Sequence, residues 1–192
     1  CAPSLLDSYQ AERDDHAHDL VSWAVDMGHL MQHVAATEAA ERDGEELPQM
    51  QQTSQKSGYG QGREQPPIRS GVVMTAQVSN EGASGYLLPQ PVVRNSNGEE
   101  VRFDDLLGAH FAVVSHEPAR FDAASTAVIN ALKIKVIDVS ALEIVYGKFP
   151  DLLQAGEALL LRPDRLVFGH TDPDVTLDSL LTRLAESLHY SR

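Results

Sequence analysis

A group of acidic and histidine side chains near the start of this 192-residue sequence has a spacing that could bind a metal. Asp26, His29 and His33 would lie on one face of a helix, and two histidines four residues apart can bind zinc. A zinc hydrolase would also need a base between the histidines, where the sequence reads Leu-Met-Gln. His16 and His18 lie further off, so a convergent third or fourth ligand is missing and no metal site is predicted.

Ser115 and His116 are the second pair whose types could do chemistry, since a histidine can activate a serine as a nucleophile. Such a pair needs a third group that orients the histidine, and the sequence offers none beside it. The stretch Ser115-His-Glu-Pro118 is therefore predicted to be a plain loop between a strand and a helix. We assign no catalytic residue.

Two glycine-containing stretches resemble cofactor or nucleophile motifs only superficially. Gly58-Tyr-Gly-Gln-Gly62 does not follow a strand pattern, so it reads as linker and not as a dinucleotide-binding loop. Gly82-Ala-Ser-Gly85 lacks the residue that a nucleophile elbow has between its serine and second glycine. No cofactor-binding residue is predicted either.

The elements that would position any site lie between Gly85 and His170. Short apolar runs of Val, Ile, Leu and Phe indicate strands that are buried on both faces; they are Phe111 to Val114, Ile134 to Val139, Ala158 to Leu161, and Leu166 to Phe168. Arg120 to Leu132 has helical apolar spacing and joins the first two strands, which predicts a parallel, right-handed crossover. Val136 and Leu160, each in the middle of its run, are expected to point into the central layer.

The end of the chain completes the fold pattern. Arg162-Pro-Asp-Arg165 predicts a hairpin turn, and a leucine stripe from Leu177 to Leu188 predicts a closing helix. Strand–helix–strand followed by strand–strand–helix is the order of a thioredoxin-like α/β domain. A redox thiol would stand where Ser115 to Pro118 lie, and there is none, so dithiol exchange is excluded.

The N-terminal part is expected to be a long helix from Ser4 to about Ala40, begun by a capping box of Ser4 and Asp7. Its interrupted apolar stripe, which includes Trp23, needs a partner to cover it, and Glu12 to Asp15 are expected to face solvent. Packing is the expected role of Trp23.

Residues 41–84 are rich in Gln, Gly, Ser and Glu and are expected to form a polar linker. Val72 to Val78 would be a short strand within it. Beyond it, Asn97-Gly98 predicts a hairpin, and Asp104 to Gly108 one helical turn capped by Asp104.

The composition excludes several function classes. A net charge of −13 disfavours binding to nucleic acid, and no apolar run is long enough to span a membrane. The single cysteine, Cys1, allows no internal disulfide, which suits a cytoplasmic protein. Because the chain begins with Cys and not Met, we expect a piece of a longer protein.

Several stretches together resemble class A FAD-dependent aromatic hydroxylases, of the type of the 3-(3-hydroxyphenyl)propionate hydroxylases. The N-terminal match is Leu5 to Arg13 with His16-Ala17, similar to the end of the catalytic region. The others look like the C-terminal extension of these enzymes, which is thioredoxin-like without redox cysteines: Leu88 to Val92, Asn97-Gly98, Leu106 to Ala109, Phe111 to Val114 and Leu161 to Arg165.

The resemblance implies a parent enzyme that uses FAD, NAD(P)H and O₂ to hydroxylate a phenolic ring. It implies residues 1–40 as the terminal helix of the catalytic region, 41–84 as the linker and 85–192 as the C-terminal domain. The flavin and substrate sites would lie upstream of Leu5, so the chain alone would hold no FAD and have no turnover. Its partners would be the missing catalytic region and, through an oligomerising role, further copies of itself. The alternative reading is a free-standing, non-redox thioredoxin-like binding module.

Overall fold

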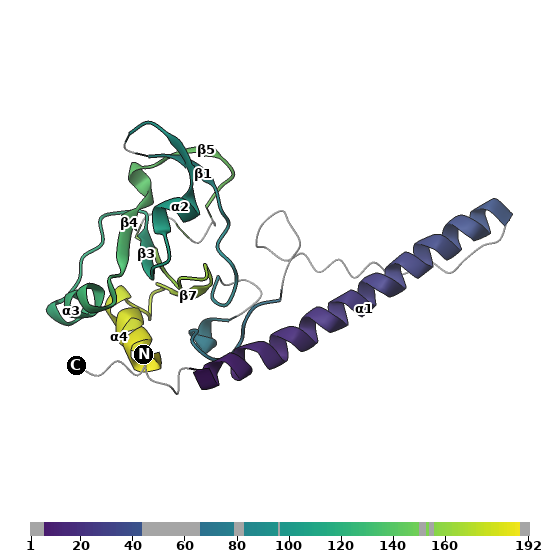
Figure 1. Cartoon of the computed structure of the whole chain (residues 1–192), viewed down its shortest axis with the longest axis horizontal. Helices are drawn as coiled ribbons and strands as arrows, with labels where there is room; N and C mark the ends of the chain where they lie inside the picture. Colours follow the sequence, from purple (N-terminus) through teal and green to yellow (C-terminus); the bar gives the residue numbers. More distant parts are fainter. Residues whose placement is uncertain are drawn as a thin grey trace.

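The computed structural model describes residues 6–43, 66–78, 83–95, 97–149, 153 and 156–188. It consists of a long helix, α1, and an α/β body to which the first turns of that helix attach (Figure 1). In chain order the elements are α1 (Asp7–Asp43), the 3-10 turn η2 (Thr75–Gln77), β1 (Val92–Arg94), β2 (Glu100–Arg102), α2 (Phe103–Leu107), β3 (Ala112–Ser115), α3 (Ala123–Leu132), β4 (Lys135–Asp138), η3 (Val139–Ala141), β5 (Glu143–Tyr146), β6 (Ala158–Leu161), β7 (Val167–His170) and α4 (Leu177–Ser187).

The main sheet has the strand order β4-β3-β6-β7. β3 and β4 run parallel and are joined by α3, while β6 is antiparallel to both β3 and β7. The strand–helix–strand and strand–strand–helix units expected from the sequence are therefore both present. In this register Val113 of β3 lies between Val136 of β4 and Leu160 of β6.

The two faces of the main sheet are covered differently, and the alternation of side chains along each strand sorts the core into two layers. Helices α3 and α4 pack on one face, where Val113, Leu160 and Phe168 meet Val128 and the leucines of α4. The predicted leucine stripe supplies that contact, because Leu180, Leu181 and Leu184 are fully buried. On the other face, Val114, Leu159 and Leu161 pack with Phe103, Leu107 and Val93, which come from α2 and the small sheet.

Both predicted hairpins are found. Asn97-Gly98 lies in the connection between antiparallel β1 and β2, and Gly98 has φ +81, a conformation that glycine adopts without strain. Arg162 to Arg165 joins β6 to β7, with the Arg165 N–H donating to the Arg162 carbonyl at 3.0 Å. The small sheet has the order β2-β1-β5.

Val136 does not lie in the central layer, as the apolar run around it had suggested. It is 44% exposed, whereas Leu160 is fully buried as expected. The physical reason is strand order, since β4 is an edge strand of the main sheet and β6 is an inner one. An edge position leaves one side of the strand without a neighbour, and this is where Val136 meets solvent.

Two local predictions are wrong. Val72 to Val78 is not a strand, because Thr75 to Gln77 form a 3-10 turn, although Val72 and Val73 are buried against the body. Asp104 does not cap the helical turn that Gly108 ends, because α2 begins at Phe103 with Arg102 at the cap position. Asp104 lies inside α2 and its carboxylate pairs with Arg165 at 3.1 Å.

The second half of the expected polar linker packs on the body. Ile68, Val72 and Val73 are buried, and the Met74 N–H donates to the Phe168 carbonyl at 2.7 Å. Gly85 is required for this packing for two reasons. Its φ is +83, and a Cβ on it would lie 2.2 Å from the Ile68 carbonyl oxygen. The part of the linker that contains Gly58 to Gly62 lies outside the described residues.

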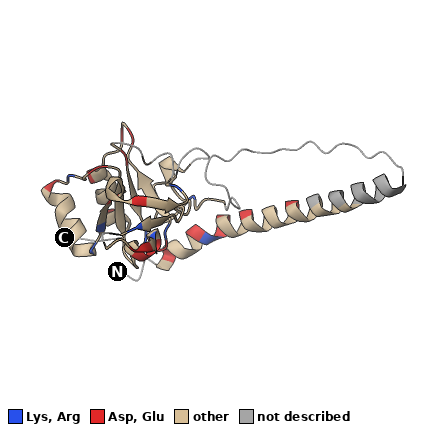
Figure 2. Ribbon diagram, turned by 90° about the horizontal axis from the view of Figure 1, so that it is seen from above, with Lys and Arg blue, Asp and Glu red and all other residues tan. Residues whose placement is uncertain are grey.

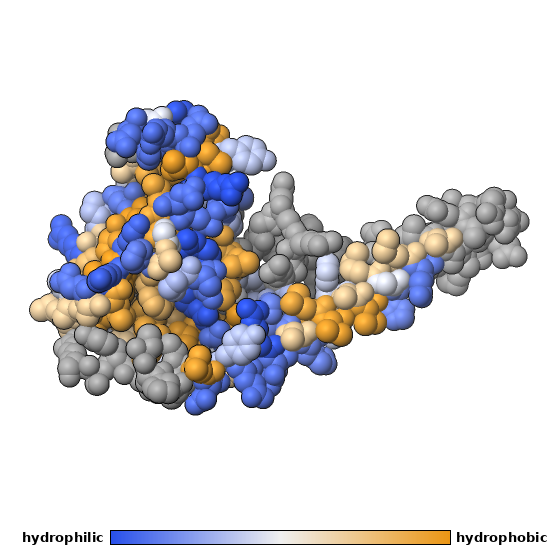
Figure 3. All heavy atoms as spheres, in the orientation of Figure 1, coloured by the Kyte–Doolittle hydropathy of each residue, from blue (hydrophilic) through white to orange (hydrophobic). Residues whose placement is uncertain are grey.

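Helix α1 leaves the body after its first few turns and extends away from it, as two views at right angles show (Figure 1, Figure 2). The expected capping residue Ser4 lies outside the described residues. Beyond the attachment, the helix exposes apolar side chains, visible as a hydrophobic band in Figure 3; among them are Val21, Trp23, Val25, Met27 and Met31. Trp23 is 39% exposed, so more than half of its surface is covered within this chain.

Candidate functional site

The residues singled out for chemistry do not assemble into a catalytic or metal site. The Ser115 hydroxyl donates to the Glu117 carbonyl at 2.6 Å, a bond within the loop, and not to His116. Asp26 and His29 are exposed on α1, and the side chain of His33 is not described. Among the residues that the structure describes, no three His, Cys, Asp or Glu side chains could hold a metal ion together.

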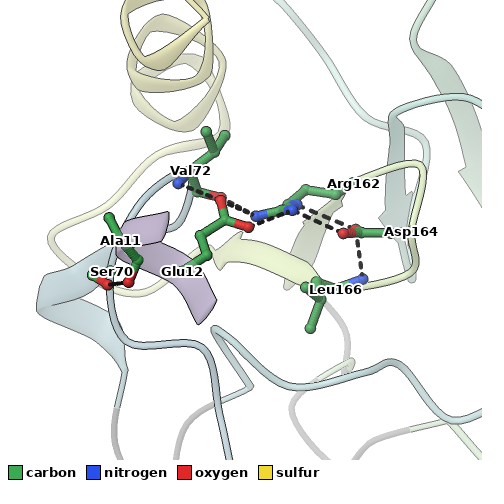
Figure 4. Close-up of polar contacts among 7 residues, drawn as sticks. All are labelled: Ala11, Glu12, Ser70, Val72, Arg162, Asp164 and Leu166. Carbon is green, nitrogen blue, oxygen red and sulfur yellow. Dashed lines mark hydrogen bonds and ion pairs between the residues drawn. The ribbon is translucent and has the colours of Figure 1, made fainter. Parts of the chain in front are cut away.

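The site that the chain does build is the joint between α1 and the body, centred on Glu12 and Arg162 (Figure 4). The carboxylate of Glu12 and the guanidinium of Arg162 form two parallel bonds, of 2.8 and 3.0 Å. Both side chains are nearly buried, at 9% and 14% exposure. Two bonds in fork geometry fix orientation as well as distance, so this pair determines how α1 sits on the β6–β7 turn.

Arg162 is the hub of the joint. Besides Glu12 it binds Asp164 at 2.8 Å and the Val72 carbonyl at 3.0 Å. Burial on its own would lower the pKa of Arg162, but hydrogen bonds and charges from Glu12 and Asp164 outweigh burial and raise it. The guanidinium is therefore a permanent cation that ties together α1, the hairpin turn and the segment around Val72.

The carboxylate of Glu12 is also held by the backbone, because the Val72 N–H donates to it at 2.9 Å. The chain passes very close to it at Gly71, where a Cβ would lie 2.3 Å from Cγ of Glu12. Gly71 has φ +85, so a side chain there would be strained as well as crowded. Ser70, which bonds the Ala11 carbonyl, and Arg69, which pairs with Asp19, extend the contact along the helix.

A small pocket of about 190 Å³ opens beside this joint. Its walls come from α1 and from the body; they are Arg13, His16, Pro66, Ile68, Gly85, Tyr86, Leu87, Asp164 and Leu166. Burial, then the nearby charges of Arg13 and Arg69, lower the pKa of His16, and the Asp19 carboxylate opposes them. The packing of α1 on the body that buries His16 therefore favours the neutral form of its side chain.

A second polar cluster joins the segment around Gln77 to β7. The Gln77 side chain donates to the His170 carbonyl at 2.7 Å and to Asp172 at 2.9 Å, and accepts from the His170 N–H at 3.1 Å. The Ser84 hydroxyl lies 3.3 Å from Nδ1 of His170. Although serine, histidine and aspartate occur together here, Ser84 is fully buried. The Asp172 carboxylate accepts from Gln77 and from the backbone N–H groups of Asp174 and Val175, so the cluster is structural.

His170 should make folding stability depend on pH. Burial lowers its pKa below the ordinary 6.5, against the opposing charges of Asp172 and Glu157. Between the two pKa values the unfolded chain binds a proton that the folded chain does not, so stability is full above about pH 6.5 and falls as the pH drops toward the folded-state pKa. Urea melts at several pH values should show this slope, and His170→Asn should flatten it. Exposed His18→Asn is the control, and an equal flattening there would contradict the assignment.

The charged run Glu12 to Asp15 predicted that Glu12 faces solvent, and this prediction is wrong. A run of four charged residues is usually solvent-exposed, but the helical period turns Glu12 and His16 toward the body and both are buried. The sequence contained one indication that Glu12 contacts Arg162. Glu12 belongs to the Leu5–Arg13 stretch and Arg162 to the Leu161–Arg165 stretch, two stretches on which the resemblance to the hydroxylases rests.

Comparison with known proteins identifies the family of the body. The family model of the HcaD C-terminal domain matches residues 85–187. The chain belongs to this family. The matched residues span the main sheet, α3 and α4. The resemblance to aromatic hydroxylases that the motifs indicated is confirmed by the family model together with relatives of that name.

Curated relatives of this HcaD-type chain extend the match across α1 as well. It is similar to a 3-(3-hydroxy-phenyl)propionate/3-hydroxycinnamic acid hydroxylase of Klebsiella pneumoniae (strain 342), at 27% identity over 96% of the chain and 37% of the relative. A protein of that name from Escherichia coli (strain K12) is 23% identical over 98% of the chain and 38% of the relative. The chain therefore spans little more than a third of these relatives.

Solved structures show that the fold recurs. The flavin-dependent monooxygenase PieE, crystallised with FAD and substrate, superposes with a TM-score of 0.60 at 17% identity, over 99% of this chain and 41% of PieE. Aklavinone-11 hydroxylase, in a ternary complex with FAD and aklavinone, gives 0.58 at 22% identity, over 98% of this chain and 36% of that one. At these identities the likeness concerns the fold.

In the described part of the chain, no helix is long and apolar enough to cross a membrane.

Proposed function

We propose that this HcaD-type chain is the C-terminal part of a flavoprotein monooxygenase that hydroxylates a phenolic substrate with FAD, NAD(P)H and O₂. The names of the curated relatives support the substrate class, and the structures of PieE and aklavinone-11 hydroxylase, both with FAD, support the cofactor. No catalytic or FAD-contacting residue is assigned to residues 1–192. The chemistry belongs to the upstream catalytic region.

The role proposed for this chain is structural. The observation that carries it is the joint of Glu12 and Arg162, which fixes a helix of 37 residues on the body. Residues 1–40 are the terminal helix of the catalytic region in this proposal, 41–84 connect it, and 85–192 form a thioredoxin-like domain without redox cysteines. The order β3-α3-β4 and β6-β7-α4 supports the thioredoxin-like assignment.

The face of α1 beyond the joint is proposed to pack on the catalytic region. Met27 and Met31 are one helical turn apart and share a face, and Met31 is 70% exposed. Exposed apolar side chains gathered on one face mark an interaction surface. A terminal helix of the catalytic region would cover this face in the whole enzyme, so that the Glu12–Arg162 joint holds body and catalytic region together.

The proposal can be tested by producing the chain alone and together with the sequence upstream of Cys1 in its gene. The chain alone should not quench or shift FAD fluorescence, since no strand, glycine-rich loop and helix unit is found in its sequence. The upstream part should bind FAD and co-purify with the chain, and the pair should oxidise NADH or NADPH when 3-(3-hydroxyphenyl)propionate is added. An upstream sequence without a dinucleotide fingerprint would refute the flavoenzyme and favour a free-standing binding module.

Charged substitutions on α1 test the packing separately. Met27→Lys with Met31→Lys should abolish co-purification, because two charges would be buried against the catalytic region. His29→Lys is the matched control, since His29 is exposed on the same stretch of helix but on the other side. Equal loss of co-purification in the control would contradict the assigned face.

A further inference from the structure

Strand β5 is an unprotected edge of the small sheet. It pairs with β1 on one side, and in the described part of the chain no strand lies along its other side. All four of its side chains are exposed, with Ile144 at 44% and Tyr146 at 78%. Edge strands present a row of N–H and C=O groups that can pair with another strand.

The usual protection of an edge is weak here. Natural edges carry lysine, proline or strong bulges, and β5 has only one register shift against β1. Its single charged residue, Glu143, is neutralised by Arg94 at 3.0 Å. A chain with net charge −13 repels a second copy over most of its surface, but the β5 edge is a low-charge, apolar exception.

We propose that β5 pairs antiparallel with β5 of a second copy of this chain, which joins the two small sheets into one of six strands, β2-β1-β5-β5-β1-β2. This inference goes beyond the function proposed above and does not rest on the flavoenzyme assignment. Strand β5 lies at the end of the body away from the attachment of α1 (Figure 1).

The pairing is self-complementary in charge. In an antiparallel pair with two-fold symmetry, one residue of the strand faces its own copy, and the axis passes midway between these two equivalent residues. An axis at Ile144 places Glu143 opposite Val145, and an axis at Val145 places Glu143 opposite Gly147. Neither register brings Glu143 against Glu143, and both stack Ile144, Val145 and Tyr146 across the new contact.

Sedimentation equilibrium of the full chain should show a concentration-dependent dimer of twice 20.9 kDa. Ile144→Lys with Val145→Lys should raise the dissociation constant by at least about tenfold, because in either register one of the two lysines then faces its own copy across the axis. Leu87→Lys and Met31→Lys make the same change at exposed apolar residues elsewhere and should leave the dimer intact. A monomer at all concentrations, or a dimer that only the control substitutions dissociate, would overturn the proposal.

Crosslinking adds a readout that folding defects do not imitate. In a Cys1→Ser background, Ile144→Cys should form a disulfide between copies if the axis passes at Ile144, and Val145→Cys if it passes at Val145. Residues directly opposite in antiparallel strands have Cα atoms about 4.5–5.5 Å apart, within disulfide range. Failure of both cysteines to crosslink under mild oxidation would reject β5 as the contact, whatever the result of the flavin experiments.

Discussion

Leu160→Ala should lower the free energy of unfolding of the body by about 2–5 kcal/mol, the usual range for a leucine deleted from a packed core. Leu160 lies on β6, between β3 and β7, and is fully buried in the layer under α4. Truncation leaves a cavity that Leu181 and Phe168 cannot close without leaving their own positions. A loss of this size is a large part of a small domain's stability.

Val136→Ala is the informative comparison, because Val136 occupies the same face and the same row of the sheet as Leu160. At the exposed edge it should cost no more than about 0.5 kcal/mol, and His116→Ala in the β3–α3 loop should behave likewise. Urea melts of the three variants test whether β4 is an edge strand or an inner strand of the main sheet. Equal losses for Val136→Ala and Leu160→Ala would place β4 inside the sheet, against the strand order described here.

This contrast shows what local sequence patterns can and cannot determine. The apolar run of β6 and the leucine stripe of α4 were readable because each buries a continuous surface. The run of β4 also looked apolar, yet whether a strand is inner or edge depends on partners elsewhere in the chain. Lys135 and Asp138 within that run were the available hint, since inner strands of such sheets are seldom interrupted by charge.

The joint was harder to predict for the same reason. Glu12 and Arg162 are 150 positions apart, and neither neighbourhood is unusual by itself. The segment from Ile68 to Met74 was predicted to be linker, with a short strand from Val72, because residues 41–84 are polar in composition. It packs on the body through a few buried side chains and backbone bonds to the body, and such irregular packing leaves no periodic signal.

Arg162→Ala should release the first turns of α1 from the body. Removing one partner of a buried pair typically costs about 3–5 kcal/mol, because the other charge is left without compensation. In this variant Glu12 would keep only the Val72 N–H. The body has its own core, so the loss should appear as local opening: amides of α1 near Glu12 should exchange about a hundredfold faster, while those of β3 and β6 should be unchanged.

Arg69→Ala is the matched control for this variant. Arg69 also joins the body to α1, through Asp19, but that pair is exposed and pairs of this kind are worth less than about 1 kcal/mol. Hydrogen exchange should therefore distinguish the two arginines. Similar exchange rates in both variants would show that the Glu12–Arg162 pair does not hold α1 on the body. Glu12→Ala combined with Arg162→Ala should cost less than the two single changes added together, because the second change removes a charge that the first had stranded.

Gly71→Ala tests the joint without removing either charge. The new methyl group would lie 2.3 Å from Cγ of Glu12, so the carboxylate must move away from Arg162 or the segment around Val72 must shift. Gly98→Ala has nearly the same positive φ but nothing within 4 Å of the added Cβ, so it carries the backbone strain without the clash. Faster exchange near Glu12 in Gly71→Ala and not in Gly98→Ala would attribute the docking of α1 to the geometry of this contact. If both variants behave alike, backbone strain alone is responsible, and the close approach of Gly71 to Glu12 does not hold the helix.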